Sequence, residues 1–382
     1  MVSTKRDPSL VVIQLSGGND TLNTIVPYSD GEYHDYRKAV KIEPDEVIPI
    51  DQRLGFNPNM RSFKRLWDEG KLAIIAGIGY PEPNRSHFRS MDIWHTAEPT
   101  KVGDEGWLGR VIHEIDPEHE NVLTGVNFGR GLPRALGKRG VPVASVGNLE
   151  TYGLYPDMTD ESLRKYALDA FAKMYGGEQG KDAVMDFMGQ TGNDALRGAD
   201  ILRTAPGKYS SGVEYAGDAM AQSLKSVAQV MFADLGTRVF YAQHGGFDTH
   251  AGELITHAKL WNEVDGAVGD FWDDLVAHDR EDDSAILIFT EFGRRIKDNG
   301  SGTDHGSGGV AFVIGGGVKG GLYGEYPSLK EEDQLEGDLQ YNNDFRGTYS
   351  ALLEQWMGIE AAPIVNGQFE QFGLFGNGGN GK

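Results

Sequence analysis

The chain has 382 residues, 39% of them hydrophobic, which is enough to build the core of one large α/β domain with insertions. Its 57 acidic and 36 basic residues leave a net charge of −21, so bulk electrostatics offers no attraction for nucleic acid or an anionic membrane. The sequence contains no cysteine, which excludes disulfides, thiol catalysis and zinc–thiolate sites. Any metal would therefore be bound by histidine, carboxylate, amide or water.

The first apolar run extends from Leu10 to Leu15 and ends in the polar segment SGGND. A signal peptide needs a longer apolar region, and a membrane span needs about 20 apolar residues. We therefore expect a cytoplasmic protein with no membrane association, unless a leader has been removed from the given chain.

Strand and helix patterns alternate along the first part of the chain. The run at 10–15 is typical of a buried strand, and residues 57–70 place apolar side chains at helical spacing. A second strand begins at residue 71 and leads through a Pro-rich loop to a helix that starts near Ser86. Residues from about 155 to 235 are rich in alanine and show helical periodicity, and we interpret them as a helical insertion.

The strand pattern resumes at residue 236 and is followed by an amphipathic helix that extends to residue 278. Two further apolar runs begin at residues 284 and 309. Such alternation predicts a single α/β domain spanning residues 1–382, with a mainly parallel sheet that is covered on both faces.

Polar side chains recur where the predicted strands end. In a parallel sheet these carboxyl ends meet at one edge, where ligands bind. Two further polar residues, in the segment GTDHG, precede the last strand instead of following one. The candidates are Asn19 and Asp20; Ser86 and His87; His244, Asp248 and His250; Glu291; and Asp304 with His305.

The segment HGGFDTH places His244, Asp248 and His250 within seven residues. Imidazole and carboxylate ligands suit Zn, Mn or Fe, whereas an all-oxygen set would suit Mg or Ca. The alternative is that Asp248 and His250 cap the helix that follows them.

Three other candidates also allow a structural interpretation. Glu291 is a metal ligand or a cap, and Arg294 either binds an anion or pairs with a surface carboxylate. Ser86 is a nucleophile or a plain N-cap, because a serine is not nucleophilic at neutral pH without a base or a metal.

Five segments together resemble DUF1501, a bacterial family within the alkaline phosphatase and sulfatase superfamily. They lie in order between residue 11 and about residue 350. The resemblance implies an alkaline phosphatase-like three-layer α/β sandwich, in which two metal ions flank a Ser or Thr nucleophile. The matching stretches are LSGGNDTLNTIVPY, NRSHFRSMDIWHTAE, FYAQHGGFDTHAGE, FTEFGRR and GTDHGSGGVAFVIGGGVKGGLYG.

Carried over by position, the resemblance makes Ser86 the nucleophile and Asp20 the carboxylate after the first strand. Asp248 becomes the aspartate of the first metal's motif, with His250 or His244 as its partner. These assignments are implied by the resemblance alone.

The resemblance also gives Glu291 the place of a metal-binding carboxylate and His305 that of the last metal-binding histidine, with Asp304 beside it as a further candidate. Small residues around His305 would let it reach a metal shared with Asp248. Phe292 stands where the superfamily has histidine, so the second metal site is expected to be altered or absent. One metal with an activated water is then an open alternative.

These observations lead to the hypothesis of a divalent-metal hydrolase acting on a small-molecule phosphate or sulfate ester, with Zn, Mn, Mg or Ca as the metal. Arg294 would hold the ester oxygens, and His87, His244 and His305 are candidate acids for the leaving group. The competing hypothesis is a binding or scaffold protein that retains a structural metal site. The helical insertion is expected to shape the pocket or to form a contact in a homo-oligomer.

Overall fold

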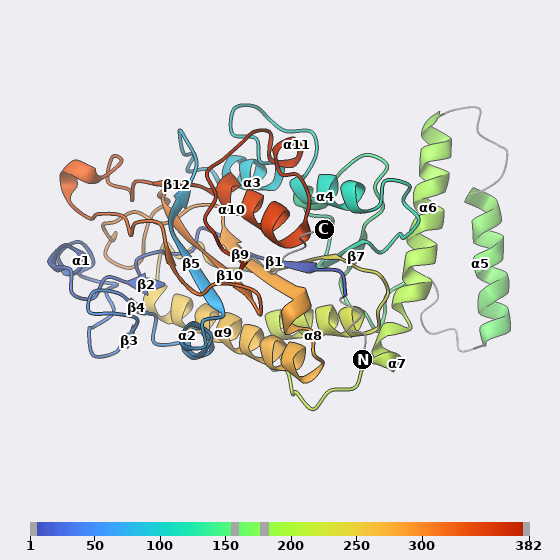
Figure 1. Cartoon of the computed structure of the whole chain (residues 1–382), viewed down its shortest axis with the longest axis horizontal. Coiled ribbons are helices and arrows are strands. Elements are labelled where there is room, and N and C mark those ends of the chain that lie inside the picture. The colour runs from blue at the N-terminus through green and yellow to red at the C-terminus, as the bar shows by residue number, and fades with distance from the viewer. Residues whose placement is uncertain (1–5, 154–159, 176–182, 377–382) are drawn as a thin grey trace.

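The computed structural model describes residues 6–153, 160–175 and 183–376. Within these residues a nine-stranded sheet forms the centre of the molecule (Figure 1). β12 (Asn343–Asp344) pairs with β5 outside the main strand order. That order is β11 (Gly321–Tyr323), β5 (Leu72–Gly79), β10 (Gly309–Gly315), β9 (Ser284–Thr290), β1 (Ser9–Ser16), β8 (Val239–Gly245), β6 (Gly125–Phe128) and β7 (Ala144–Val146).

Most neighbouring strands run in the same direction, which confirms the predicted mainly parallel α/β sheet. β1 is parallel to β8 and β9, and β6 is parallel to β7 and β8. β10 is the exception, because it is antiparallel to both β5 and β9. The amino end of β10 therefore lies at the same edge as the carboxyl ends of β1, β5, β8 and β9.

Two apolar cores lie on opposite faces of the sheet, and β1 contributes to both. Val11 and Ile13 pack into one core, while Leu10 and Val12 pack into the other. Alternation of this kind follows from the two-residue period of a strand. A strand that is buried on both faces reads in sequence as the continuous apolar run LVVIQL.

Helices cover both faces and give three layers. One face carries α2 (Arg61–Asp68), α8 (Ala219–Phe232) and α9 (Glu253–Ala277). The other carries α3 (His87–Thr96), α4 (Trp107–Ile115), α10 (Phe345–Ala351), the π-helix η4 (Leu352–Met357) and α11 (Ala362–Val365).

Smaller elements lie outside the main sheet and its covering helices. β2 (Ile25–Val26), β4 (Gly55–Phe56) and β3 (Ile48–Pro49) form a three-stranded sheet near α1 (Gly31–Tyr36). Three short 3-10 helices occupy Arg134–Leu136, Glu281–Asp283 and Glu331–Asp333.

The region predicted as a helical insertion contains two kinds of helix. α5 (Glu161–Tyr175) and α6 (Ala183–Leu202) stand side by side beyond the β7 edge, and the short α7 (Ala205–Lys208) follows them (Figure 1). α8 packs instead on α9 and β8, and so belongs to a covering layer. Residues 154–159 and 176–182, within or beside the predicted range, lie outside the described residues. Among the described helices, none has the length and hydrophobicity needed to cross a bilayer.

Candidate metal centre

Three loops at one edge of the sheet bring imidazole and carboxylate groups together. Asp248 and His250 follow β8, His87 begins α3 after β5, and His305 precedes β10. Because β10 is antiparallel to its neighbours, a residue before it reaches the edge that residues after the other strands reach. The position of His305 ahead of an apolar strand is explained by this reversal.

The ligand atoms of these residues converge around His305. Its Nε2 atom lies 2.9 Å from Nε2 of His87, 2.9 Å from Nε2 of His250 and 3.0 Å from Oδ1 of Asp248. Nε2 atoms of His250 and His87 lie 3.0 and 3.5 Å from the same Asp248 oxygen. Ligands bound tetrahedrally at about 2.0–2.1 Å would be separated by roughly 3.3 Å, within the observed range.

The other ring nitrogen of each histidine contacts a group that only accepts hydrogen bonds. Nδ1 of His305 donates to the carbonyl oxygen of Arg85 at 2.8 Å. Nδ1 of His87 donates to Glu291 at 2.8 Å, and Nδ1 of His250 to Asp304 at 3.1 Å. In the neutral rings all three protons are therefore on Nδ1, and the Nε2 lone pairs of His87 and His250 both face that of His305. A cation placed among them would remove this repulsion.

Asp248 supplies the negative charge of the cluster. Partial burial works against its ionisation, but the hydrogen bond from Arg294 and the charge of its guanidinium outweigh that effect and lower the pKa of Asp248 to about 2. The side chain is 47% exposed, so the cluster is open to solvent on one side. Its carboxylate is ionised at neutral pH and available to a metal.

Glu291 lies behind the cluster instead of in it. The residue is buried, and its Oε1 accepts hydrogen bonds from the backbone N–H of Gly17 and from His87, while Oε2 accepts from Thr290. The hydrogen bond to Glu291 raises the pKa of His87. Carboxylates of this kind orient metal-binding histidines and make them better ligands. Asp304 has the same relation to His250, so both acids predicted as ligands lie one contact further out.

Arg294 is fully buried and all of its donor nitrogens are bonded within the protein. Nε donates to Gly18, Nη1 to Thr303, and Nη2 to Gly17, Phe247 and Oδ1 of Asp248. The guanidinium thus fixes the loops that carry the cluster. This geometry does not allow the predicted role of holding ester oxygens, because no part of the group faces solvent.

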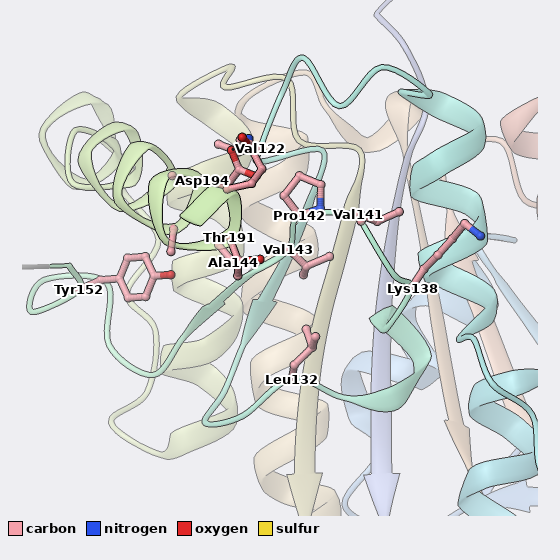
Figure 2. A pocket seen from close by; sticks show the side chains of 14 residues that line it. Val122, Leu132, Lys138, Val141, Pro142, Val143, Ala144, Tyr152, Thr191 and Asp194 are labelled. Atoms are coloured by element: carbon pink, nitrogen blue, oxygen red, sulfur yellow. Dashed lines mark hydrogen bonds between the residues drawn. The ribbon is translucent and has the colours of Figure 1, made fainter. Parts of the chain in front are cut away.

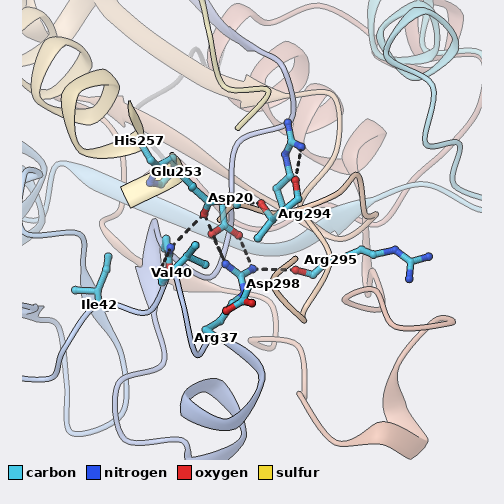
Figure 3. A network of polar contacts seen from close by, with 12 residues as sticks. Asp20, Arg37, Val40, Ile42, Glu253, His257, Arg294, Arg295 and Asp298 are labelled. Atoms are coloured by element: carbon cyan, nitrogen blue, oxygen red, sulfur yellow. Dashed lines mark hydrogen bonds and ion pairs between the residues drawn. The ribbon is translucent and has the colours of Figure 1, made fainter. Parts of the chain in front are cut away.

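Asp20 pairs with an arginine and is not part of the cluster. Both of its oxygens accept hydrogen bonds from Arg37, at 2.6 and 2.8 Å, and both side chains are completely buried (Figure 3). Burial alone would raise the pKa of Asp20, but the Arg37 guanidinium outweighs it and holds that pKa below its usual range. The expected metal ligand is therefore one half of a buried ion pair.

Two other predicted residues lie apart from the convergent nitrogen atoms. His244, the next-to-last residue of β8, contacts Glu263 of α9 at 3.0 Å, and burial lowers the pKa of its ring. Ser86 is the N-cap residue of α3, as predicted from sequence, but its hydroxyl makes no capping hydrogen bond and the residue is exposed. It stands directly before His87, so the two predicted neighbours have different environments.

Residues that sequence reasoning missed hold the loops close to one another. Gly17 has φ +122°, and a Cβ there would lie 2.3 Å from the backbone nitrogen of Asp248. A Cβ at Gly306 would lie 2.5 Å from the backbone of Arg294. In the sequence, the glycines of SGG and HGS are the signal that these loops approach one another closely, because such contacts leave no room for a side chain. No comparable pattern marks Arg37 as the partner of Asp20.

A protein-family comparison matches residues 78–354 to the family described as "Protein of unknown function (DUF1501)". The chain belongs to the DUF1501 family. This finding confirms the resemblance inferred from the five segments. None of the curated proteins compared with the chain matches it.

Solved structures similar to this DUF1501 chain include enzymes of the alkaline phosphatase and sulfatase superfamily. The PsFucS1 sulfatase from Pseudoalteromonas sp. is 13% identical, with 98% of this chain and 73% of that chain covered and a TM-score of 0.42. The C-terminal periplasmic domain of EcEptC from Escherichia coli, in complex with Zn, is 8% identical, with 82% and 74% covered and a TM-score of 0.39. Alkaline phosphatase from the Antarctic bacterium TAB5 is 8% identical, with 83% and 95% covered and a TM-score of 0.33.

A cleft of about 520 Å³ opens beside the cluster of this DUF1501 chain, and His87, Asp248 and Glu291 are among the residues that line it. A second pocket, of about 280 Å³, lies between α6 and the β7 edge (Figure 2). The second pocket is lined mainly by apolar side chains such as Val122, Val143 and Tyr152, and by none of the predicted site residues. The first cleft therefore combines space with the groups that carry chemistry.

Proposed function

We propose that this protein is a metal-dependent hydrolase of phosphate or sulfate esters, with a small anionic ester as its substrate. The observation that carries the proposal is the convergence of three histidine Nε2 atoms on one oxygen of Asp248. His87, Asp248 and His305 have ligand atoms within 4.8 Å of one another, and His250 contacts two of the three. An imidazole-rich set favours Zn or Mn over Mg or Ca.

In this proposal the four residues would hold one divalent cation, which supplies a concentrated positive charge that polarises an ester and acidifies an attacking hydroxyl or water. Glu291 and Asp304 keep the protons of His87 and His250 on Nδ1 and so leave Nε2 free. Arg294 holds Asp248 in place. A local positive charge is what an anionic ester needs in order to approach a protein with a net charge of −21.

Two routes of attack are compatible with the proposal. In the first, implied by the family resemblance, the hydroxyl of Ser86 attacks the ester. In the second, water attacks directly. The exposed position of Ser86 and the lack of a recorded hydrogen bond from its hydroxyl to a base among the described residues favour water. With Ser86→Ala, attack by water leaves kcat within a few-fold of wild type, whereas attack by serine predicts a loss of several orders of magnitude.

The test measures metal content and ester hydrolysis together. Wild type, His305→Ala and the control His34→Ala, a partly buried histidine in α1, are loaded with Zn or Mn, dialysed and assayed on aryl phosphates, phosphodiesters and aryl sulfates. We expect one metal per chain and turnover of at least one ester class in wild type and the control, with both lost in His305→Ala. A bound metal with no turnover of any ester would support a structural site instead.

A further inference from the structure

The cleft next to the metal centre has a polar floor. β1 provides Gln14 and Ser16 on the same face, since residues two apart point the same way in a strand. α3 provides His87 and His95, and Arg134 also lines the cleft. A volume of about 520 Å³ lies within the range of pockets that hold small molecules.

A buried chain of hydrogen bonds fixes the direction of the Ser16 hydroxyl. The side-chain oxygen of Gln14 accepts hydrogen bonds from the Tyr241 hydroxyl and from Nε2 of His95, the latter at 2.8 Å. Burial lowers the pKa of His95 to about 4, so its ring is neutral and donates this proton. The Gln14 amide nitrogen is thereby turned towards Ser16 and donates to its Oγ at 2.5 Å.

Ser16 is left with a proton that it can donate into the cleft. Its Oγ already accepts from Gln14, and the structure records no acceptor for the hydroxyl among the described residues. The next residue, Gly17, packs directly against the backbone of Asp248 and donates to Glu291. The Ser16 hydroxyl therefore lies at the end of β1, next to the residue that contacts Asp248 and Glu291.

Arg134 brings the second set of available donors to this cleft. Its guanidinium pairs with Asp92 at 2.8 Å and donates to the carbonyl oxygen of Gly103, which uses two of its five N–H groups. The side chain is 44% exposed, in contrast to the fully buried Arg294. The side chains of Phe88, 92% exposed, and Met91 add an apolar wall beside it.

We propose that Ser16 and Arg134 bind the oxyanion of a metal-bound monoester whose organic group is a single ring packed along Phe88 and Met91. The inference rests on the proposed hydrolase function and deepens it. Ser16 donates a hydrogen bond to one ester oxygen, and Arg134 neutralises the remaining charge. Both act on the substrate directly, and neither forms a covalent bond with it.

Calorimetric titration of the zinc-loaded protein tests this assignment with two probes that are not hydrolysed. Inorganic phosphate reports the anion site alone, and phenylphosphonate adds one ring. Wild type, Ser16→Ala and Arg134→Gln are compared with two controls, Ser226→Ala in α8 and Arg139→Gln, an exposed arginine that gives the same change in charge. Zinc content measured on each variant reports an intact metal centre.

In wild type and both controls we expect phenylphosphonate to bind more tightly than phosphate. Loss of a hydrogen bond to a charged group predicts a Kd that rises about ten-fold for both probes in Ser16→Ala and in Arg134→Gln. If wild type binds both anions and the two variants keep wild-type affinity, the inference is overturned while the hydrolase proposal stands. If zinc-loaded wild type binds neither anion, the hydrolase proposal fails and the inference falls with it.

Discussion

Glu291 determines which nitrogen of His87 carries the proton and how the ring is oriented. The carboxylate accepts the Nδ1 proton of His87 at 2.8 Å and is itself held by Gly17 and Thr290. Because the Glu291 side chain is buried, its orientation is set by these contacts and not by solvent. In the proposed metal centre, Glu291 would act on the cation through His87.

Replacement of Glu291 by Gln removes the charge behind His87 but preserves the size of the side chain. Removing a partner of this kind typically costs ~10–100-fold in metal affinity, and we expect a zinc Kd raised by that factor. Competition with a chromophoric chelator measures it. Glu114→Gln, an exposed acid in α4, is the matched control. Equal zinc affinities in the two variants would show that Glu291 does not orient the ligand.

Three elements that are distant in sequence are joined by the buried pair of Asp20 and Arg37. Arg37 caps α1 and donates to the carbonyl oxygens of Arg295 and Ile296, which follow Arg294 in sequence (Figure 3). Glu253, in the first turn of α9, contacts the same guanidinium at 3.7 Å. The network thereby links α1 and α9 to the loop between β9 and β10, whose Arg294 contacts Asp248.

Removal of the cation from this network should be costly. Arg37→Met leaves the carboxylate of Asp20 buried without its partner, which predicts a loss of about 3–5 kcal/mol in the free energy of unfolding. Urea denaturation at pH 7 measures the change. Arg53→Met, at an exposed position, should stay within about 0.5 kcal/mol of wild type. An Arg37→Met protein as stable as this control would contradict the role of the pair.

The pKa of Glu253 is shifted in the opposite direction to that of Asp20. Burial and the nearby Asp20 raise the pKa of Glu253 from 4.5 to about 9, so its carboxyl group is neutral at pH 7. The folded protein then holds a proton that the unfolded chain has lost. The associated stability is present below pH 4.5 and declines as the pH rises towards 9.

Glu253→Gln keeps a neutral group in the folded protein, so we expect near wild-type stability below pH 4.5 and higher stability than wild type at pH 7, where folding of wild type must protonate Glu253. Between pH 5 and pH 9 the variant should lose less stability than wild type. Denaturation curves across that range, with Glu114→Gln as the control, measure the difference. A steep loss of stability in the variant at pH 7 would mean that Glu253 is ionised in the folded protein.

At the scale of the whole molecule, the metal should stabilise the fold by binding only the folded state. Three loops contribute to the proposed centre, so a cation at 100 times its Kd adds about 2.7 kcal/mol to the free energy of unfolding. For a chain of this size that corresponds to a rise in Tm of a few degrees. EDTA should reverse the rise in wild type and have no effect on the Tm of His305→Ala. An EDTA-insensitive Tm in zinc-loaded wild type would count against the shared centre.

The sequence was sufficient to predict the layered fold and the strand ends where Asp248, His250 and His305 lie. Apolar runs and helical spacing are local signals, and loops after parallel strands meet at one edge by geometry alone. His87 was predicted as an acid and not as a ligand, because the first residue of α3 carries no pattern that distinguishes the two roles. His87 became a candidate ligand only once the structure placed His305 beside it, and the position of His305 depends on the reversed direction of β10.

The misplaced predictions share a physical cause. Asp20 and Arg294 are charged residues beside strand ends, as ligands and substrate-binding groups are, and sequence cannot tell whether their charges face a site or a buried partner. Arg37 is separated from Asp20 by the whole of the small sheet's first strand and α1. Pairing of this kind is decided by tertiary packing.

The central claim is that His87, Asp248, His250 and His305 share one divalent cation. A crystal structure of the zinc-loaded protein, with anomalous data collected at the zinc edge, tests it most directly. We predict one anomalous peak about 2.0–2.2 Å from the three Nε2 atoms and an oxygen of Asp248. An absent peak in zinc-saturated crystals, or a peak bound by other residues, would contradict the account.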